Sequence, residues 1–227
     1  MIDKNSLGNT IDVLNDGFFF NKKLSDKQKH EAALWIASRQ GLPGSYAGMF
    51  APTEDDFKNG VQVFTGEKIT TGAGTAHILG EEACRILVLL NVDDTKVKTA
   101  LKKTQNGMVN RLNDSQIQGY STDLFCCGPC TIALWRNLIV GGLNKQKERL
   151  KAGLKEMKIL RDGKGRWRRF RFYYALLALH EIDLEEARDE LIYARPAMER
   201  ALNRNSGQEK YQLRKLKLLE LILKKMH

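Results

Sequence analysis

Apolar residues recur along most of this chain at the three- to four-residue spacing of helices that bury one face, and the alternation typical of strands is nearly absent. The first such helix follows Ser25, a good N-cap, and leads into Gly41, a residue type common after helix ends. The predicted helices cover residues 26–40, 76–90, 95–112, 129–140, 145–160, 168–179, 184–202 and 209–226. The pattern therefore predicts an all-α protein.

Residues 41–74 show little helical pattern. Within them only residues 60–69 alternate apolar and polar positions, which predicts a short hairpin or an extended loop. A plain connector of this length is uncommon in a compact domain, and loops so long usually cover a site or form an interface. We therefore expect this segment to lie over the concave side of the molecule.

Several predicted helices are followed by a glycine close to an aromatic residue, and then by a second helix. These corners read Gly44-Ser45-Tyr46, Gln118-Gly119-Tyr120 and Gly165-Arg166-Trp167, and a degenerate fourth contains Gly207 and Tyr211. Such a unit is an αα-hairpin whose inner face cannot be buried alone, so neighbouring copies must stack. We expect one domain of stacked αα-hairpins, residues 1–227, with Tyr46, Tyr120 and Trp167 at equivalent corners.

The first corner resembles a known sequence repeat, and the residues that carry the likeness are Trp35-Ile36, Gln40, Gly44 and Tyr46. Their spacing is similar to that of the QW repeat of squalene cyclases and protein prenyltransferase β-subunits, with tyrosine in place of the final tryptophan. The third corner keeps Gly165 and Trp167 but has Arg161 at the position of the glutamine. The resemblance implies an arc or partial αα-toroid whose inner helices line a cavity, which in that family accepts isoprenoid chains.

The chemistry of that family is only partly represented here. Its cyclases need an Asp-x-Asp-Asp motif, and neither residues 54–56 nor residues 92–94 fit it, so terpene cyclisation is not expected. Its prenyltransferases hold zinc with an aspartate, a cysteine close after it and a later histidine. The resemblance implies Asp123, Cys126 and His180 for such a zinc site, with an Asp-to-Cys spacing that departs from the family pattern.

Residues 125–130, Phe-Cys-Cys-Gly-Pro-Cys, hold all but one of the four cysteines and precede a predicted helix. Gly128 and Pro129 fit a turn into a helix N-terminus, where the helix dipole lowers the pKa of a thiol. Cys127 or Cys130 is then a candidate reactive thiolate. The string Cys-Gly-Pro-Cys also occurs in thioredoxins, but no preceding strand supports that fold here.

Four interpretations of the cysteine cluster stay open. The thiols can be a redox pair, or one of them a nucleophile with His77 or His180 as the base, the latter oriented by Glu181 or Asp183. They can also bind a metal, such as zinc, with three thiolates and a histidine, although a Cys-x-x-Cys string supplies only half of a tetrahedral site. Finally, they can be small buried residues that fill the start of an inner helix.

His77, Glu81 and Arg85 follow one another at four-residue intervals and so form a polar row on one predicted helix. The row is either a salt-bridge ladder or, with Gly72 and Gly74, a mouth that receives an anion, in which His77 acts as acid or base and Arg85 as charge partner. The predicted ligand-binding residues are Tyr46, Glu81, Arg85, Tyr120 and Trp167.

The net charge of +10 belongs to residues 144–227, which contain 22 Lys and Arg against 12 Asp and Glu, whereas residues 1–143 contain 15 of each. Such a region meets nucleic acid, an anionic membrane surface or a phosphorylated ligand, but exposed basic residues also serve solubility. Residues 164–174 interleave arginines with aromatic residues, either to stack on single-stranded nucleic acid or to pack the core with the arginines outward. The last predicted helix docks by one stripe, which consists of Leu213, Leu216, Leu219 and Leu223.

The composition, 42% hydrophobic and 28% charged, is typical of a globular chain. No apolar run approaches the roughly 18 to 20 residues that a bilayer requires, and the first residues lack the pattern of a secretory signal. We therefore expect a cytoplasmic protein.

Two functional hypotheses follow. In the first, a concave pocket binds an extended apolar or anionic ligand, with thiol chemistry at residues 126–130. In the second, a non-catalytic helical scaffold binds nucleic acid or an acidic protein through the basic C-terminal third.

Overall fold

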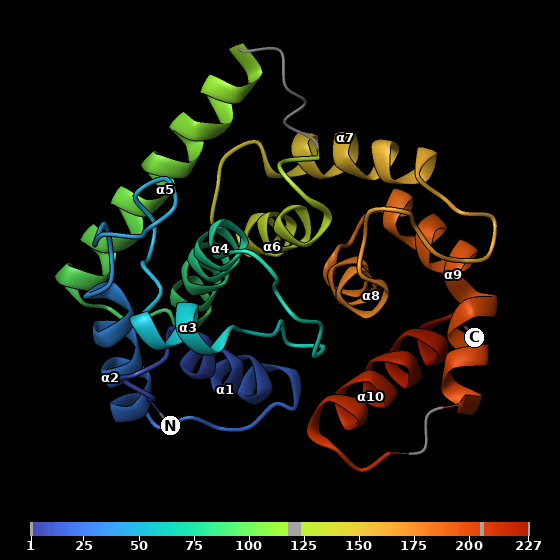
Figure 1. The fold of residues 1–227 in the computed structure, drawn as a ribbon, viewed down its shortest axis with the longest axis horizontal. Helices are drawn as coiled ribbons and strands as arrows, with labels where there is room; N and C mark the ends of the chain where they lie inside the picture. The colour runs from blue at the N-terminus through green and yellow to red at the C-terminus, as the bar shows by residue number, and fades with distance from the viewer. Residues whose placement is uncertain (1, 118–123, 205–206, 227) are drawn as a thin grey trace.

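The computed structural model describes residues 2–117, 124–204 and 207–226, and within these ranges the chain is all-α (Figure 1). The helices are α1 (Leu7–Phe19), α2 (Asp26–Ala37), α3 (Glu54–Asn59), α4 (Gly72–Leu90), α5 (Thr95–Ile117), α6 (Gly128–Ile139), α7 (Gln146–Ile159), α8 (Phe172–Glu181), α9 (Glu185–Arg204) and α10 (Lys210–Lys225). The predicted helices are all present, with ends that differ by a few residues. The described ranges contain no strand, and residues 60–69 form an extended turn closed by an isolated bridge between Gln62 and Lys68.

Helices α1 and α3 are the two that the hydrophobic pattern did not predict. In α1 the side chain of Ser6 accepts a hydrogen bond from the Asn9 backbone N–H, and Leu7, Ile11 and Leu14 are buried on one face. The pattern is present but short, and polar residues and Gly17 interrupt it. Helix α3 is a six-residue segment inside the long loop, capped by Thr53.

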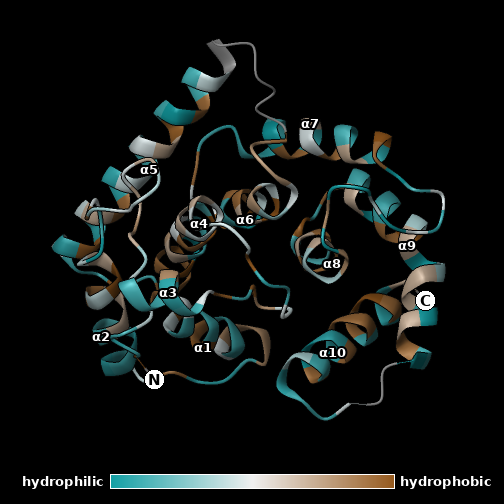
Figure 2. Ribbon diagram, viewed as in Figure 1, coloured by the Kyte–Doolittle hydropathy of each residue, from teal (hydrophilic) through white to brown (hydrophobic). Residues whose placement is uncertain are grey.

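The helices form an inner row and an outer row, which confirms the predicted stack of αα-hairpins. Figure 1 shows α4, α6 and α8 nearly end-on at the centre, with α5, α7 and α9 around the outside. In the inner row α4 packs against α6 and α6 against α8. The inner helices are apolar around most of their circumference, whereas the outer helices carry polar faces toward solvent (Figure 2). A helix that is apolar on all sides must be surrounded by others, and this requirement places α4, α6 and α8 inside.

The two ends of the chain close the arc. Helix α1 packs against α4, and α10 packs against α8 and α9. Between α1 and α10 the buried guanidinium of Arg214 donates hydrogen bonds to the carboxylates of Asp12 and Asp16. A buried arginine is tolerated only when it is paired in this way, so the ion pairs join the N-terminal and C-terminal helices.

The long loop enters the space between the helices. The ring of Phe64 lies 5.1 Å from that of Phe19 in α1 and 4.1 Å beneath the guanidinium of Arg214 in α10. The carboxylate of Glu67 accepts a hydrogen bond from the Tyr174 backbone N–H in α8. A cavity of only about 20 Å³ lies beside this turn. An extended apolar ligand in this space would therefore have to displace a segment of the protein itself.

Two of the predicted corners share one backbone conformation. Gly44 and Gly165, each two residues before its aromatic partner, both have φ of +85°, in the region that favours glycine. Isolated bridges close both turns, between Gln40 and Phe50 in one and between Arg161 and Trp167 in the other. Of the other two predicted corner aromatics, Tyr120 lies outside the described residues. Tyr211 lies in the first turn of α10, and Gly207 before it does not share the positive φ of Gly44 and Gly165.

Helix α10 docks by one face, as predicted, but the stripe is different. Its buried residues are Arg214, Leu218, Leu219 and Ile222, and Leu213 is 49% exposed. The face is rotated by about one residue because Arg214 must reach the carboxylates of α1. The prediction from leucine positions alone was wrong in this respect, because it gave no weight to a buried ion pair.

Candidate functional site

The cysteine turn, residues 125–130, leads into α6 and is held against the turn before α8. Cys127 is the N-cap of α6. The Arg169 guanidinium donates a 2.8 Å hydrogen bond to the carbonyl oxygen of Cys126. A Cβ at Gly128 would lie 1.9 Å from the Arg169 carbonyl oxygen, so this close approach requires glycine. The cysteine turn is therefore fixed relative to α6 and α8.

Cys127 and Cys130 form an asymmetric pair of thiols. Their Sγ atoms are 3.3 Å apart, against about 2.05 Å in a disulfide. Cys127 is exposed and Cys130 is buried. The hydrogen bond between the two side chains lowers the pKa of Cys127 to about 5, and that same interaction together with burial raises the pKa of Cys130. One sulfur is thus an accessible thiolate, while the other is a protected thiol within a short movement of it.

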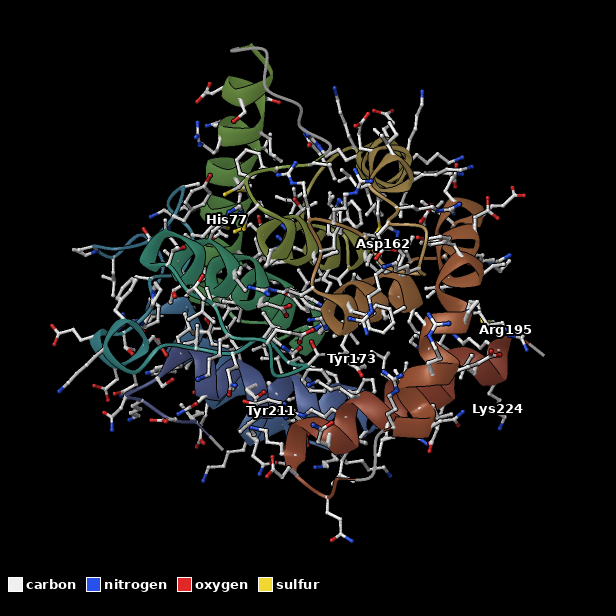
Figure 3. The ribbon with its side chains drawn as sticks, turned by 45° about the vertical axis from the view of Figure 1, so that its right-hand side comes forward. His77, Asp162, Tyr173, Arg195, Tyr211 and Lys224 are labelled. Carbon is white, nitrogen blue, oxygen red and sulfur yellow. The ribbon has the colours of Figure 1, made fainter. Side chains whose placement is uncertain are left out.

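His77 of α4 lies beside these thiols, close to sulfur atoms in Figure 3. Its imidazole is 1% exposed, because Tyr46 stacks on it with ring centroids 4.1 Å apart and Phe125 meets it edge-on at 5.3 Å. His77, Cys126 and Cys130 bring their ligand atoms within 4.8 Å of one another. Although burial lowers it, the Cys126 and Glu81 side chains raise the pKa of His77 above its usual value.

Within the part of the chain that the structure describes, neither ring nitrogen of His77 makes a hydrogen bond. The nearest acceptor in its own helix is Glu81, whose Oε1 lies 3.5 Å from Nε2 and is itself without a hydrogen bond. The other oxygen of Glu81 accepts a 2.6 Å hydrogen bond from the Asn137 side chain of α6. Most buried polar groups are satisfied, so an unpaired imidazole beside an unpaired carboxylate oxygen marks this location as unusual.

Arg85, predicted as a charge partner of His77, belongs to a separate buried network. Its guanidinium donates to the Asn15 side chain at 2.7 Å and to Glu181 at 3.0 Å. Arg136 of α6 donates two hydrogen bonds to Glu181, at 2.8 and 2.9 Å, and a third to Glu82. The predicted anion mouth is therefore not formed by Arg85, because its charge is neutralised inside the protein.

His180, predicted as a base or a zinc ligand, does not lie with the cysteines. It is at the end of α8, where it lines a groove with Asp183 and Lys225. Its neighbour Glu181 pairs with Arg136, which is about 9 Å of helix rise beyond Cys130 in α6. The predicted zinc ligands were Asp123, Cys126 and His180. The structure places His180 elsewhere, and Asp123 lies outside the described residues.

Trp167 has a structural role at its corner. Its ring is buried, and its Nε1–H donates a 2.8 Å hydrogen bond to Glu190 of α9. Arg161 pairs with the same carboxylate at 2.9 and 3.0 Å. Of the predicted ligand-binding aromatics in the described residues, Tyr46 stacks on His77 at the cysteine site, whereas Trp167 packs against Phe172 and Tyr193.

A basic turn lies next to the cysteine turn. In residues 164–171 the aromatic side chains of Trp167 and Phe170 are buried, while the basic side chains point outward. The exposed basic residues are Lys164, Arg166, Arg168, Arg169 and Arg171. Because the Arg169 side chain donates a hydrogen bond to the Cys126 carbonyl oxygen, this positive surface adjoins the exposed thiol of Cys127.

The sequence-based prediction missed Glu82, Arg136, Asn15 and Tyr174, which build the buried network. A signal was available for two of them. Glu82 and Arg136 stand within otherwise apolar helical segments, and charged residues are almost never fully buried unless they are paired. Two apolar helical segments that each contain a charged residue therefore indicate that these residues pair inside the protein. The sequence does not show which acidic residue pairs with which basic one.

No known family, curated protein or solved structure matches this chain. The resemblance to squalene cyclases and prenyltransferase β-subunits stays a prediction. Among the described residues no helix is long and apolar enough to cross a membrane.

Proposed function

We propose that this chain carries out thiol–disulfide exchange, with Cys127 as the attacking sulfur and Cys130 as the resolving one. The observation that carries this proposal is the pair of sulfur atoms 3.3 Å apart at the N-terminus of α6, one exposed and one buried. A helix N-terminus favours a thiolate, and burial keeps the second thiol away from solution oxidants.

The reaction balances with a disulfide as the co-reactant. The Cys127 thiolate attacks one sulfur of the substrate disulfide, which gives a mixed disulfide and releases the first substrate thiolate. Cys130 then loses its proton and attacks the Cys127 sulfur, which releases the second substrate thiolate. Two electrons pass from the two cysteines to the substrate, and the protein is left with a Cys127–Cys130 disulfide.

The surroundings of Cys127 favour an anionic substrate. The basic turn adjoins the cysteine turn, and the guanidinium of Arg111 lies 6.0 Å from the ring centroid of Phe125, the first residue of that turn. Exposed charges act over about 10 Å at 0.1 M salt, so these arginines attract carboxylates that approach the exposed thiol. This part of the original hypothesis, an anionic ligand, is retained, whereas the extended apolar ligand is not.

Peptide mapping tests the exchange. The reduced protein is treated with hydroxyethyl disulfide, quenched in acid and analysed by mass spectrometry. We expect a Cys127–Cys130 disulfide, a stable mixed disulfide on Cys127 in the Cys130→Ser variant, and no disulfide on Cys130 in Cys127→Ser. Cys84→Ala is the matched control, because burial raises the pKa of the Cys84 thiol and keeps it out of the reaction. A Cys126–Cys130 link, or modification of Cys127 no faster than that of Cys84, contradicts the assignment.

The substrate class is tested by comparing disulfides of different charge. Rates with dianionic dithiobis(nitrobenzoate), neutral hydroxyethyl disulfide and dicationic cystamine are each divided by the rate with a free small thiol. We expect a preference of about tenfold for the anion at low salt that shrinks in 1 M salt, where the screening length is about 3 Å. Replacing Arg168 and Arg171 by Ser should reduce the preference, while Lys27→Ser, on the exposed surface of α2, should not. Equal normalised rates for all three disulfides would remove the anionic substrate from the proposal.

A further inference from the structure

We propose that the reduced cysteine turn binds one zinc ion through His77, Cys126 and Cys130, with Cys127 as the fourth ligand. The binding stands on its own observations, and only its coupling to oxidation rests on the proposed thiol–disulfide exchange.

The first observation is the unpaired imidazole of His77. It is 1% exposed, neither of its nitrogens makes a hydrogen bond to a described residue, and its closest carboxylate contact is Glu81 Oε1, 3.5 Å from Nε2. Burying a polar ring without a partner is unfavourable unless another interaction compensates for it. The thiols of Cys126 and Cys130 face this ring, and a cation between the three groups supplies the missing partner.

The second observation is the spacing of the ligand atoms. Zinc binds thiolate at about 2.3 Å and imidazole at about 2.0–2.1 Å, so the ligand atoms of a tetrahedral site are about 3.5–3.8 Å apart. The atoms of His77, Cys126 and Cys130 all lie within 4.8 Å of one another, and the sulfurs of Cys127 and Cys130 are 3.3 Å apart. Shifts of about 1 Å bring the ligand atoms of His77, Cys126 and Cys130 to these separations, whereas the Cys127 sulfur, which lies outside this group of three, has to move farther to become the fourth ligand.

The third observation is the backbone of Cys126. Its φ is +66°, in the left-handed region that non-glycine residues seldom adopt, and the hydrogen bond from Arg169 to its carbonyl oxygen helps to hold it there. Strained residues of this kind concentrate at functional sites. In this conformation the Cys126 sulfur lies with the His77 ring and the Cys130 sulfur in one group of possible ligand atoms.

Glu81 completes the arrangement behind the first ligand shell. Metal-bound histidines usually donate their second N–H to a carboxylate, which fixes the tautomer. Glu81 Oε1 lies 3.5 Å from His77 Nε2 and is otherwise unpaired, and Asn137 holds the opposite oxygen of that carboxylate. Three thiolates and one imidazole are a donor set typical of zinc, and the stacked Tyr46 excludes water from the histidine.

The metal and the disulfide use the same sulfurs, so they exclude each other. Zinc holds Cys127 and Cys130 as thiolates and withholds them from exchange, while the disulfide removes two of the four ligands and releases the ion. The site would then be inactive with zinc bound and active without it.

Cobalt substitution tests the site in the full-length reduced protein. Metal-free protein is titrated anaerobically with Co²⁺, and thiolate-to-cobalt charge-transfer absorption is followed before zinc is added in competition. We expect one ion per chain, intense absorption from a tetrahedral thiolate site, and loss of the signal when zinc displaces cobalt. His77→Gln, Cys126→Ser and Cys130→Ser should each weaken zinc binding by at least tenfold.

The matched control is His180→Gln, which alters a histidine outside the site and should bind zinc as the unaltered chain does. Cys126 is exposed, so its serine variant keeps the test decisive even where His77→Gln fails to fold. Absence of charge-transfer absorption, or unchanged affinity in Cys126→Ser, would overturn the zinc site. If peptide mapping finds the Cys127–Cys130 disulfide but the titration finds no zinc binding, only the zinc site is contradicted. If zinc binds but that disulfide does not form, only the proposed exchange function is contradicted.

Discussion

Polar residues inside the inner helices separate into two groups with different consequences. Glu82, Arg136 and Glu181 satisfy one another, and Tyr174 adds a 2.7 Å hydrogen bond to Glu82. Among the described residues, His77 at the other end of the same helices makes no hydrogen bond, and the nearest carboxylate oxygen, that of Glu81, lies 3.5 Å from its Nε2. The paired group therefore holds helices together, while the unpaired residue is the one that points to a ligand.

Trp167 provides a test of the corner residues. The change Trp167→Ala removes a buried ring and the hydrogen bond to Glu190, and we expect it to lower the free energy of unfolding by about 3–5 kcal/mol. Ile159→Ala is the control, because that side chain is 70% exposed and should change the stability by less than about 0.5 kcal/mol. Urea denaturation measures both. Similar midpoints for the two variants would show that the corner ring does not lock the repeats.

The inner helices run parallel, which gathers their starts at one end of the molecule. His77 near the start of α4 meets the cysteine turn before α6, and that turn contacts Arg169 before α8. Farther along the same helices, Arg136 meets Glu181. Repetition of the αα-hairpin thus brings together connections that are far apart in the sequence, and the reactive groups lie on these connections rather than in a central hollow.

Gly128 tests the contact between two of these connections. An alanine Cβ there would lie 1.9 Å from the Arg169 carbonyl oxygen, so Gly128→Ala should cost about 1–3 kcal/mol and weaken zinc binding. Gly17→Ala in α1 is the matched control, because nothing lies within 4 Å of the added Cβ and alanine favours a helix interior by about 0.5–1 kcal/mol. Thermal unfolding should therefore move in opposite directions in the two variants. An unchanged melting temperature in Gly128→Ala would mean that the two turns are free to separate.

The charge of the whole molecule is distributed unevenly in space as well as in sequence. Several basic residues of the C-terminal third are engaged in ion pairs, among them Arg161, Arg188 and Arg214. The exposed basic turn adjoins the thiols instead of forming an isolated surface. Binding of nucleic acid or an acidic protein by this region stays a prediction. It would show as an affinity that falls steeply as the salt concentration rises.

The buried network makes stability depend on pH. Although burial raises it, Arg136 and Arg85 hold the pKa of Glu181 below its ordinary value of 4.5. A lowered carboxyl pKa adds stability above the ordinary value, and this contribution is lost as the pH falls through the folded-state pKa. We expect the melting temperature to fall between pH 5 and pH 3, and to fall less in Glu181→Gln. That variant should also lose roughly 3 kcal/mol at pH 7, because two buried arginines lose the carboxylate that they share, although Arg136 keeps Glu82 and Arg85 keeps Asn15.

The matched control for this pH dependence is Glu54→Gln, at an exposed position of α3. It should follow the unaltered chain across the whole pH range. Equal acid sensitivity of the unaltered chain and Glu181→Gln would show that other carboxylates cause the loss of stability.

The amino-acid sequence by itself determined the helical class, eight of the helices, two of the glycine–aromatic corners and the position of the cysteine cluster at a helix start. Each of these depends on neighbours within a few residues along the chain. Only the tertiary structure decided that His77 and not His180 lies with the thiols, that Arg85 is neutralised in a buried network, and that the turn at residues 60–69 fills the space between the helices. Those outcomes depend on which helices pack side by side and in which direction they run. Local spacing carries no information about a contact between residues 77 and 126. That contact arises because α4 and α6 pack side by side and run in the same direction.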